Sequence, residues 1–274
     1  MTMERRLFDQ FRKIIYEQAG IDLREGKEAL VDARVAKRLR QLNIESPSQY
    51  LKYLEEDKSG KELVSFLDAI STNFTFFFRE NDHFDSLAQF VKERLAQGQR
   101  RFRIWSAASS TGEEPYSIAI TLMEIFDEAR VDFMILATDI SSEVLTKAKS
   151  GFFSNVDGLS KYQLSKYFHR GGRRDADKST YQINDSVKKH VVYKRMNLSK
   201  PPFPMPGPLD VVFCRNVMIY FDRIVRQGLI TDIERMLGPG GMLMIGHTET
   251  LTGIQSGLST VKAAHYKKPG KPVF

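Results

Sequence analysis

The period of the hydrophobic pattern changes at about residue 100, and this change limits the fold more than any other feature of the chain. Over residues 4–70, apolar residues recur at the three- and four-residue spacing of amphipathic helices, as at Phe8, Phe11 and Ile15. From Phe102 onward, short apolar runs alternate with helical stretches, which is the pattern of a parallel sheet with crossover helices. We therefore expect a small all-α domain followed by an α/β domain.

The expected division of the chain follows from these patterns. Residues 1–70 would form the all-α N-terminal domain, 71–84 a linker and 85–274 the α/β domain, with a small antiparallel β insertion at about 165–190. The expected strands are 102–107, 133–138, 191–193, 209–214, 242–246 and a last strand over 258–267. The expected helices between them are 114–126, 142–149 and 224–237.

Composition excludes several classes of protein. The chain has 274 residues, 42% of them hydrophobic, which rules out wholesale disorder. Its one cysteine cannot form an intrachain disulfide, and zinc sites built from several thiolates are excluded. The N-terminus lacks the apolar core of a signal peptide, and no apolar run approaches the roughly 18 residues of a membrane span. We therefore expect a cytoplasmic protein without membrane insertion.

The chain is basic, and its positive charge is concentrated. The net charge is +7, and residues 166–195 alone hold nine Lys or Arg against three Asp. A basic surface can bind nucleic acid, an anionic membrane or an acidic protein, and charge alone does not choose among them. The five histidines are scattered along the sequence, and none is spaced with Asp, Glu or Cys as metal ligands usually are. We therefore predict no metal site.

The segment 105–117 joins an expected strand to an expected helix through small residues that would let a ligand approach the backbone. Ligands of open α/β sheets bind at the carboxyl ends of the strands, and this segment lies at such an end. It has neither G-x-G-x-x-G nor the Gly-Lys-Ser/Thr of a P-loop, and Glu113 and Glu114 stand where a phosphate would sit. The segment is either a site for a ligand with a cationic group or a plain turn whose acidic residues favour the helix N-terminus.

Polar residues follow two further strands. Asp139 comes 27 positions after Gly112, at a distance where an acidic residue holds a ribose hydroxyl pair. Its alternative role is to cap the next helix, which Ser141 could do instead. Asn216 and Tyr220 follow the fourth expected strand and should point into the same cleft.

The linker carries four Phe residues interleaved with Asn73, Thr75 and Arg79. Two interpretations are open. The Phe residues could pack into the seam between the two domains, which composition alone favours. Alternatively, the segment could close over the cleft, with the three polar side chains turned inward towards a ligand.

Taken together, these segments closely resemble the chemotaxis receptor methyltransferases of the CheR type. The resemblance covers nearly the whole chain and is most specific over 110–117 and 214–221; the other matching runs are 72–80, 105–109, 137–141 and 238–246. It implies a Rossmann-like class I methyltransferase domain that uses S-adenosylmethionine (SAM), with S-adenosylhomocysteine as the product and no metal. The implied reaction is O-methylation of glutamate side chains on the cytoplasmic helices of chemoreceptors, which gives γ-glutamyl methyl esters.

The resemblance also implies a cofactor site. Glu114, preferred to Glu113, would meet the ammonium group of SAM, and Asp139 would take the ribose hydroxyls. The implied cofactor-binding residues are Asn73, Thr75, Arg79, Ala107, Glu114, Asp139, Asn197, Leu198, Asn216 and Val217. A substrate glutamate with the ordinary pKa of about 4.3 is already ionised at neutral pH, so no general base is needed. We expect Arg79 and Tyr220 to be the catalytic residues, because they could hold that carboxylate beside the methyl group.

The resemblance implies receptor contacts as well. Arg34, Lys37, Arg38 and Arg40 share one expected helix, which would steer acidic receptor helices; a solvated face is the alternative. In some family members an edge strand of the β-subdomain pairs with a pentapeptide at the receptor's C-terminus. The loop 171–177 does not align with those members, so this contact stays open. Recruitment to receptor arrays is implied, and a monomer is the default.

Two rival functions remain at this stage. A nucleic-acid methyltransferase would use the same cofactor domain and positive charge, but residues 215–218 read Arg-Asn-Val-Met rather than an Asn/Asp-Pro-Pro-Tyr type of motif. We therefore expect no nucleic-acid partner. A non-catalytic SAM-binding adaptor at receptor arrays ranks lower, because every expected site position holds a competent residue.

Overall fold

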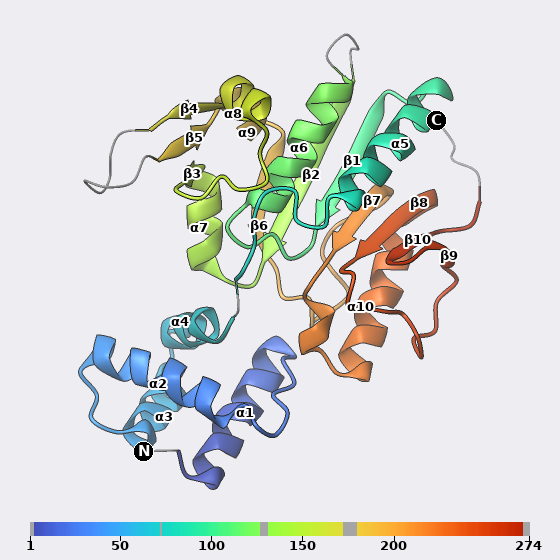
Figure 1. Ribbon diagram of the computed structural model, residues 1–274. Helices are drawn as coiled ribbons and strands as arrows, with labels where there is room; N and C mark the ends of the chain where they lie inside the picture. The colour runs from blue at the N-terminus through green and yellow to red at the C-terminus, as the bar shows by residue number, and fades with distance from the viewer. Residues whose placement is uncertain (1–2, 72, 127–130, 172–179, 271–274) are drawn as a thin grey trace.

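The computed structural model describes residues 3–71, 73–126, 131–171 and 180–270. It shows a small helical domain joined through a linker to a larger α/β domain (Figure 1). This arrangement confirms the predicted fold class. None of the helices in the described residues is both long and apolar enough to cross a bilayer.

The N-terminal domain is a packed group of helices. Its members are α1 (Arg5–Ala19), α2 (Glu28–Leu42), α3 (Pro47–Glu56) and α4 (Lys61–Ile70). The rings of Phe11, Tyr50 and Phe66 meet at the centre of this domain with centroid separations of 5.6–6.0 Å. The Tyr50 hydroxyl donates a hydrogen bond to the Glu62 carboxylate over 2.6 Å. The buried face predicted from helical spacing therefore supplies a core of its own.

The α/β domain is built on a seven-stranded sheet with the order β6-β2-β1-β7-β8-β10-β9. Its parallel strands are β1 (Arg101–Ser106), β2 (Asp132–Asp139), β6 (Val191–Arg195), β7 (Leu209–Cys214) and β8 (Leu237–Ile245). After β1, the chain adds β2 and then β6 on one side of β1. It later crosses back and adds β7 and then β8 on the other side of β1. The carboxyl end of β1 is therefore the topological switch point, where ligands of such sheets bind.

Helices cover both faces of this sheet. They are α5 (Asp82–Ala96), α6 (Glu113–Ile125), α7 (Ser142–Ser150) and α10 (Arg223–Met236), with the 3₁₀ turn η1 (Met218–Tyr220). Each face of the sheet has its own hydrophobic core, and successive residues of β7 point into one or the other. Val211 and Phe213 pack with α5 and α6, whereas Val212 and Cys214 pack with α10. Cys214 is fully buried, as expected of a core thiol.

The end of the chain differs from the prediction. The single last strand expected over 258–267 is wrong, because the segment forms two short antiparallel strands, β9 (Ser259–Lys262) and β10 (His265–Lys267). The chain reverses at Ala264, which has a left-handed φ of 61° although it is not glycine. No Gly, Pro or Asn marks this turn in the sequence, so the local pattern resembled one continuous strand.

The predicted antiparallel insertion is present as a separate three-stranded sheet with the order β3-β5-β4. Its elements are β3 (Phe152–Phe153), α8 (Lys161–Tyr167), β4 (Phe168–Arg170), β5 (Tyr181–Ile183) and α9 (Asp185–Lys188). The sheet therefore begins before the range of about 165–190 expected for it. Residues 172–177 of the loop that the sequence left unaligned lie outside the described residues.

Candidate active site

A cavity of about 350 Å³ lies at the carboxyl end of β1, between the two domains. Its wall includes the ends of β1, β2 and β7, the linker, and the connection between α1 and α2. The fold brings every cofactor-binding and catalytic candidate named from the sequence into this wall: Asn73, Thr75, Arg79, Ala107, Glu114, Asp139, Asn197, Leu198, Asn216, Val217 and Tyr220. Residues from six separate segments of the chain thus share one cavity.

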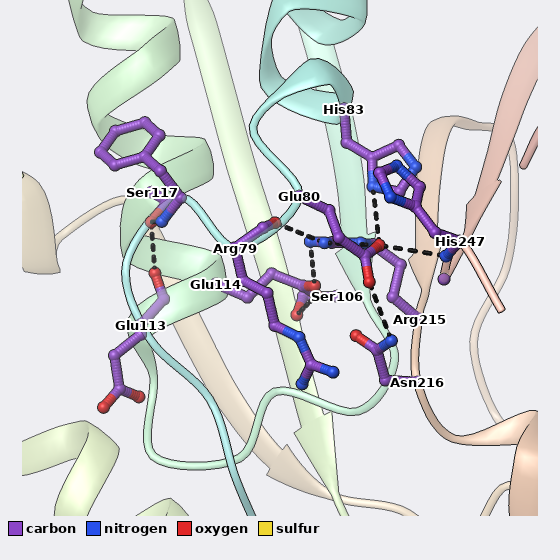
Figure 2. Close-up of polar contacts among 12 residues, drawn as sticks. Arg79, Glu80, His83, Ser106, Glu113, Glu114, Ser117, Arg215, Asn216 and His247 are labelled. Carbon is purple, nitrogen blue, oxygen red and sulfur yellow. Dashed lines mark hydrogen bonds and ion pairs between the residues drawn. The ribbon is translucent and has the colours of Figure 1, made fainter. Parts of the chain in front are cut away.

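Glu114 contributes an acidic group to the wall. Its carboxylate accepts hydrogen bonds from the Ser106 hydroxyl at 2.7 Å and from Arg215 at 2.9 Å. Burial raises the pKa of Glu114, because the site disfavours the charged form. Glu113 is turned away from this pair (Figure 2), and its carboxylate accepts from the Thr111 hydroxyl at 2.6 Å. Glu114 therefore lines the cavity, whereas Glu113 does not.

Arg215 organises this wall, although sequence reasoning did not single it out. Its guanidinium is buried between two carboxylates, with Glu80 at 3.0 Å and Glu114 at 2.9 Å (Figure 2). It also donates to the backbone carbonyl of Arg79, which ties the linker to the end of β7. Two carboxylates face one guanidinium, so this wall has an excess of negative charge that suits a cationic ligand.

The loop after β7 is fixed by another carboxylate that the sequence did not reveal. Glu249 accepts hydrogen bonds from the backbone N–H groups of Asn216, Met218 and Gly246 at 2.7–2.9 Å. Asn216 has a left-handed φ of 57°, and its side chain donates to Glu80 at 3.1 Å. The strained turn at Asn216 is therefore held from both sides.

Asp139 lies at the end of β2 and is buried. Its carboxylate accepts from the N–H of Ser110 at 2.9 Å and from that of Ser141 at 3.0 Å. Burial raises the pKa of Asp139. The capping alternative is resolved in favour of Ser141, whose hydroxyl accepts from the N–H of Val144 at the start of α7. Asp139 is thus left to face the cavity.

The linker side chains divide between two places: Phe77 packs into the core of the α/β domain rather than into the seam between the domains, whereas Asn73, Thr75 and Arg79 line the cavity. Phe77 is fully buried and packs on Phe153 and Phe168 of the β-subdomain, with ring centroids 4.9 and 5.5 Å away. Phe74 is 72% exposed, and its carbonyl accepts a hydrogen bond from the Arg79 guanidinium. Among the described residues, no carboxylate pairs with Arg79, so its positive charge remains available at the cavity wall.

The N-terminal domain contacts the cavity directly. Asp22 donates its N–H to the carbonyl of Tyr220 at 2.7 Å, and Ile21 forms a β-bridge with Phe221. The Asn197 side chain donates to the carbonyl of Gln18 at the end of α1 over 2.6 Å. We call residues 20–23 the α1–α2 strap; the contacts of Ile21 and Asp22 attach the helical domain to the loop that carries Tyr220.

The predicted receptor-facing helix is α2. Arg34, Lys37 and Arg40 are partly or fully exposed on it. Arg38 is different, because it forms a 2.6 Å ion pair with Glu62 in which the side chains are 15% and 6% exposed. Arg38 thus joins α2 to α4 and is already neutralised. The role of the four residues in recognition stays a prediction.

Three of the five histidines that are scattered in sequence lie together in the structure. The ring of His83 lies 4.9 Å from that of His247 and 4.7 Å from that of His265, between centroids. Glu80 and Asp82 are adjacent to this group. The sequence could not reveal it, because its members come from the start of α5, the end of β8 and the start of β10.

The chain is similar to known proteins along most of its length. Residues 73–267 match the family model described as "CheR methyltransferase, SAM binding domain", and residues 6–71 match "CheR methyltransferase, all-alpha domain". The chain is 39% identical to a chemotaxis protein methyltransferase of Salmonella typhimurium, with 93% of this chain and 88% of that protein covered. It is 37% identical to the one from Borreliella burgdorferi, with 93% and 92% covered. The chain therefore belongs to the CheR methyltransferase family, the SAM-dependent methyltransferases of chemotaxis.

Proposed function

We propose that this chain transfers the methyl group of SAM to glutamate side chains on the cytoplasmic helices of chemoreceptors, giving γ-glutamyl methyl esters. The observation that carries the proposal is the separation of charge within one cavity. Glu114 and Asp139 form an acidic part of the wall, and Arg79 supplies a guanidinium without a carboxylate partner among the described residues. A cationic methyl donor and an anionic acceptor each have a complementary surface there.

The donor groups of the cavity fit SAM, which has an ammonium group, a ribose and an adenine but no phosphate. Glu114 suits the ammonium group, and Asp139 suits the ribose hydroxyls. Asn197 and Leu198 would flank the adenine, while Asn73, Thr75, Ala107, Asn216 and Val217 would complete the contacts. The one buried cation of the acidic wall, Arg215, is already neutralised by carboxylates, so it does not favour a phosphate.

The proposed reaction requires mainly that the protein orient the substrate carboxylate and remove water from it. When bound, SAM supplies a methyl group on a sulfonium sulfur, and S-adenosylhomocysteine is the product. The substrate carboxylate, with an ordinary pKa of about 4.3, arrives ionised at neutral pH and needs no base. Arg79 and Tyr220 would hold this carboxylate in line with the methyl group and displace water from it. No metal takes part in this proposal.

Receptor recognition is proposed for α2. Arg34, Lys37 and Arg40 offer positive charge that would steer acidic receptor helices towards the cavity, while Arg38 holds the helix in place through Glu62. The enzyme would act as a monomer in the cytoplasm at receptor arrays. Binding of a receptor C-terminal pentapeptide at an edge of the β-subdomain remains open.

The proposal is tested by incubating the protein with methyl-labelled SAM and receptor-containing membranes, with DNA and RNA in parallel reactions. We expect the label to enter a receptor band and to leave it as methanol under mild alkali, since carboxyl methyl esters are alkali-labile. Label in nucleic acid would favour the rival enzyme class. Binding of SAM without transfer to any receptor preparation would favour a non-catalytic adaptor.

A further inference from the structure

A cluster of three histidines and two carboxylates lies beside the cavity but outside its wall. His83 is in the first turn of α5, His247 follows β8, and His265 begins β10. Figure 2 shows the rings of His83 and His247 next to each other beside Glu80. None of the three histidines lines the cavity, so the mechanism leaves their function unexplained.

The buried imidazoles of this cluster have unused nitrogens. His83 and His265 are both 0% exposed. Within the part of the chain that the structure describes, neither ring nitrogen of His83 makes a hydrogen bond, nor does Nε2 of His265, although Nδ1 of His83 lies 3.5 Å from the Glu80 carboxylate. A buried polar atom without a partner costs roughly 1–3 kcal/mol, so natural proteins rarely leave three such atoms together. These three nitrogens therefore keep the capacity to bind a further group.

Two features prepare these imidazoles to act as ligands. In His265, Nδ1 lies 2.7 Å from the carbonyl of Ala263. The carbonyl can only accept, so Nδ1 carries the proton and Nε2 keeps a free lone pair. This is the arrangement by which proteins orient metal-binding histidines. The second feature is burial: the ring of His83 is 0% exposed and its centroid lies 4.7 Å from that of His265, so the two imidazoles are held side by side.

Asp82 adds a carboxylate to the candidate ligands and lies on the solvent side of the two buried imidazoles. Ligand atoms of Asp82, His83 and His265 lie within 4.8 Å of one another. The Asp82 carboxylate also contacts Nε2 of His247 at 2.8 Å, and these two side chains are about half exposed. The ligand atoms of His247 lie within 4.8 Å of those of His83 and Glu80, so His247 meets the first group through His83 and Asp82. The two imidazoles of His83 and His265 are therefore the buried members of the group, and Asp82 and His247 are its solvent-accessible members.

Glu80 is less suited to be a ligand, because it is already engaged. Its carboxylate accepts from Arg215 at 3.0 Å, from Asn216 at 3.1 Å and from the N–H of His247 at 3.2 Å. The same contacts limit the repulsion that an ion would meet, since Glu80 and Glu114 neutralise the guanidinium of Arg215.

We propose that Asp82, His83, His247 and His265 form a binding site for a divalent transition-metal ion, with Zn²⁺ as the best match. Three imidazoles and one carboxylate suit four-coordinate Zn²⁺, whereas Mg²⁺ and Ca²⁺ prefer oxygen ligands. The ligand atoms must close to about 2.0–2.2 Å from the ion, and the half-exposed Asp82 and His247 are able to move. The ion would join α5, β8 and β10 behind the acidic wall and would not touch the substrate.

This site would stabilise the part of the fold that positions Glu80. His247 donates its N–H to Glu80, and Glu80 in turn holds Arg215 and Asn216. An ion that binds only the folded state raises the free energy of unfolding in proportion to the logarithm of its concentration over Kd. The role proposed for the ion is therefore structural rather than catalytic.

The test uses the full-length protein, free of any histidine tag and stripped with a chelator. Calorimetric titration with Zn²⁺ should show one saturable equivalent, and the midpoint of thermal unfolding should rise with added Zn²⁺. Co²⁺ should give the intense visible absorption of a tetrahedral site. His247→Asn should weaken Zn²⁺ binding at least tenfold; since His247 is half exposed, this variant should still fold.

His169→Gln is the matched control. His169 is exposed on β4, away from the cluster, and its ring nitrogens contact Asn184 and Gln182. This variant should bind Zn²⁺ as the unmodified chain does. Absence of saturable Zn²⁺ binding would overturn the proposal, and so would equal binding by the His247→Asn variant. His265→Asn provides a second variant, whose loss of the Co²⁺ absorption would support the assigned ligand set.

Discussion

At the scale of single residues, the two adjacent glutamates after β1 differ in a way that their sequence position hides. Glu114 is paired with Arg215 in the cavity wall, and Glu113 is held by Thr111 outside it. Glu114→Gln should weaken SAM binding at least tenfold, because the ammonium group loses a charged partner in a buried site. Glu113→Gln is the matched control and should change Kd less than threefold. Calorimetry measures both, and a larger loss in the Glu113 variant would contradict the assignment.

Arg79 should affect turnover much more than stability. Among the residues that the structure describes, its guanidinium donates one hydrogen bond, to the carbonyl of Phe74, so Arg79→Ala should leave the unfolding midpoint nearly unchanged. Loss of the group that orients the substrate carboxylate should lower kcat by about 100-fold or more. Methyl-transfer kinetics and thermal unfolding test this together, with the exposed Arg6→Ala as control. Near-normal kcat would remove Arg79 from the mechanism.

The raised pKa of Asp139 leads us to predict that SAM binding depends on pH. Burial raises its folded-state pKa above the ordinary value, and the ribose hydroxyls need the ionised form as acceptor. Affinity should therefore be full above this raised pKa and fall as pH decreases through it, by up to tenfold per unit. SAM titrations across acidic pH should show a steeper loss for the unmodified protein than for Asp139→Asn. Identical slopes would show that Asp139 does not titrate in the binding reaction.

At the scale of elements, the linker is anchored by one aromatic side chain. Phe77 packs between Phe153 and Phe168, so Phe77→Ala should cost about 3–5 kcal/mol of unfolding free energy. Phe74→Ala removes an exposed ring and should cost less than about 0.5 kcal/mol. Denaturant unfolding of the two variants makes the comparison. Equal losses would mean that the linker is not held by the β-subdomain.

The sequence predicted elements well where periodicity or turn residues mark them. The strand over 209–214 was predicted with the bounds of β7, and the helices flanking the cavity were within one residue at each end. The β9–β10 turn was missed because Ala264 adopts a left-handed φ that tertiary contacts impose. β3 was missed because two residues carry no detectable period.

The site was partly predictable for a similar reason. Asp139, Asn216 and Tyr220 lie at or after strand ends, and the topology of parallel sheets brings strand ends together. The choice of Glu114 over Glu113 came from the family resemblance. Arg215 and Glu80 were missed, since their pairing spans 135 positions and leaves no local signal. The histidine cluster was even harder to predict from the sequence, because its members come together only when β10 pairs with β8.

At the scale of the whole molecule, the two domains share the site through the α1–α2 strap. Asp22→Pro removes the N–H that donates to the carbonyl of Tyr220. Losing one hydrogen bond of about 0.5–1.5 kcal/mol should lower kcat roughly two- to tenfold, with little change in SAM affinity. Asp22→Ala keeps the N–H and serves as control. If both variants lose kcat equally, the side chain of Asp22, not the strap hydrogen bond, is responsible.

The central claim is that one cavity binds SAM and passes its methyl group to a receptor carboxylate. The most direct measurement is peptide mass spectrometry of a chemoreceptor after reaction with SAM and this protein, beside a reaction with Arg79→Ala. The account predicts methyl esters on glutamate side chains of the receptor's cytoplasmic helices, and their near absence with the variant. Methyl groups on another residue type, or none on the receptor while SAM binds, would contradict it.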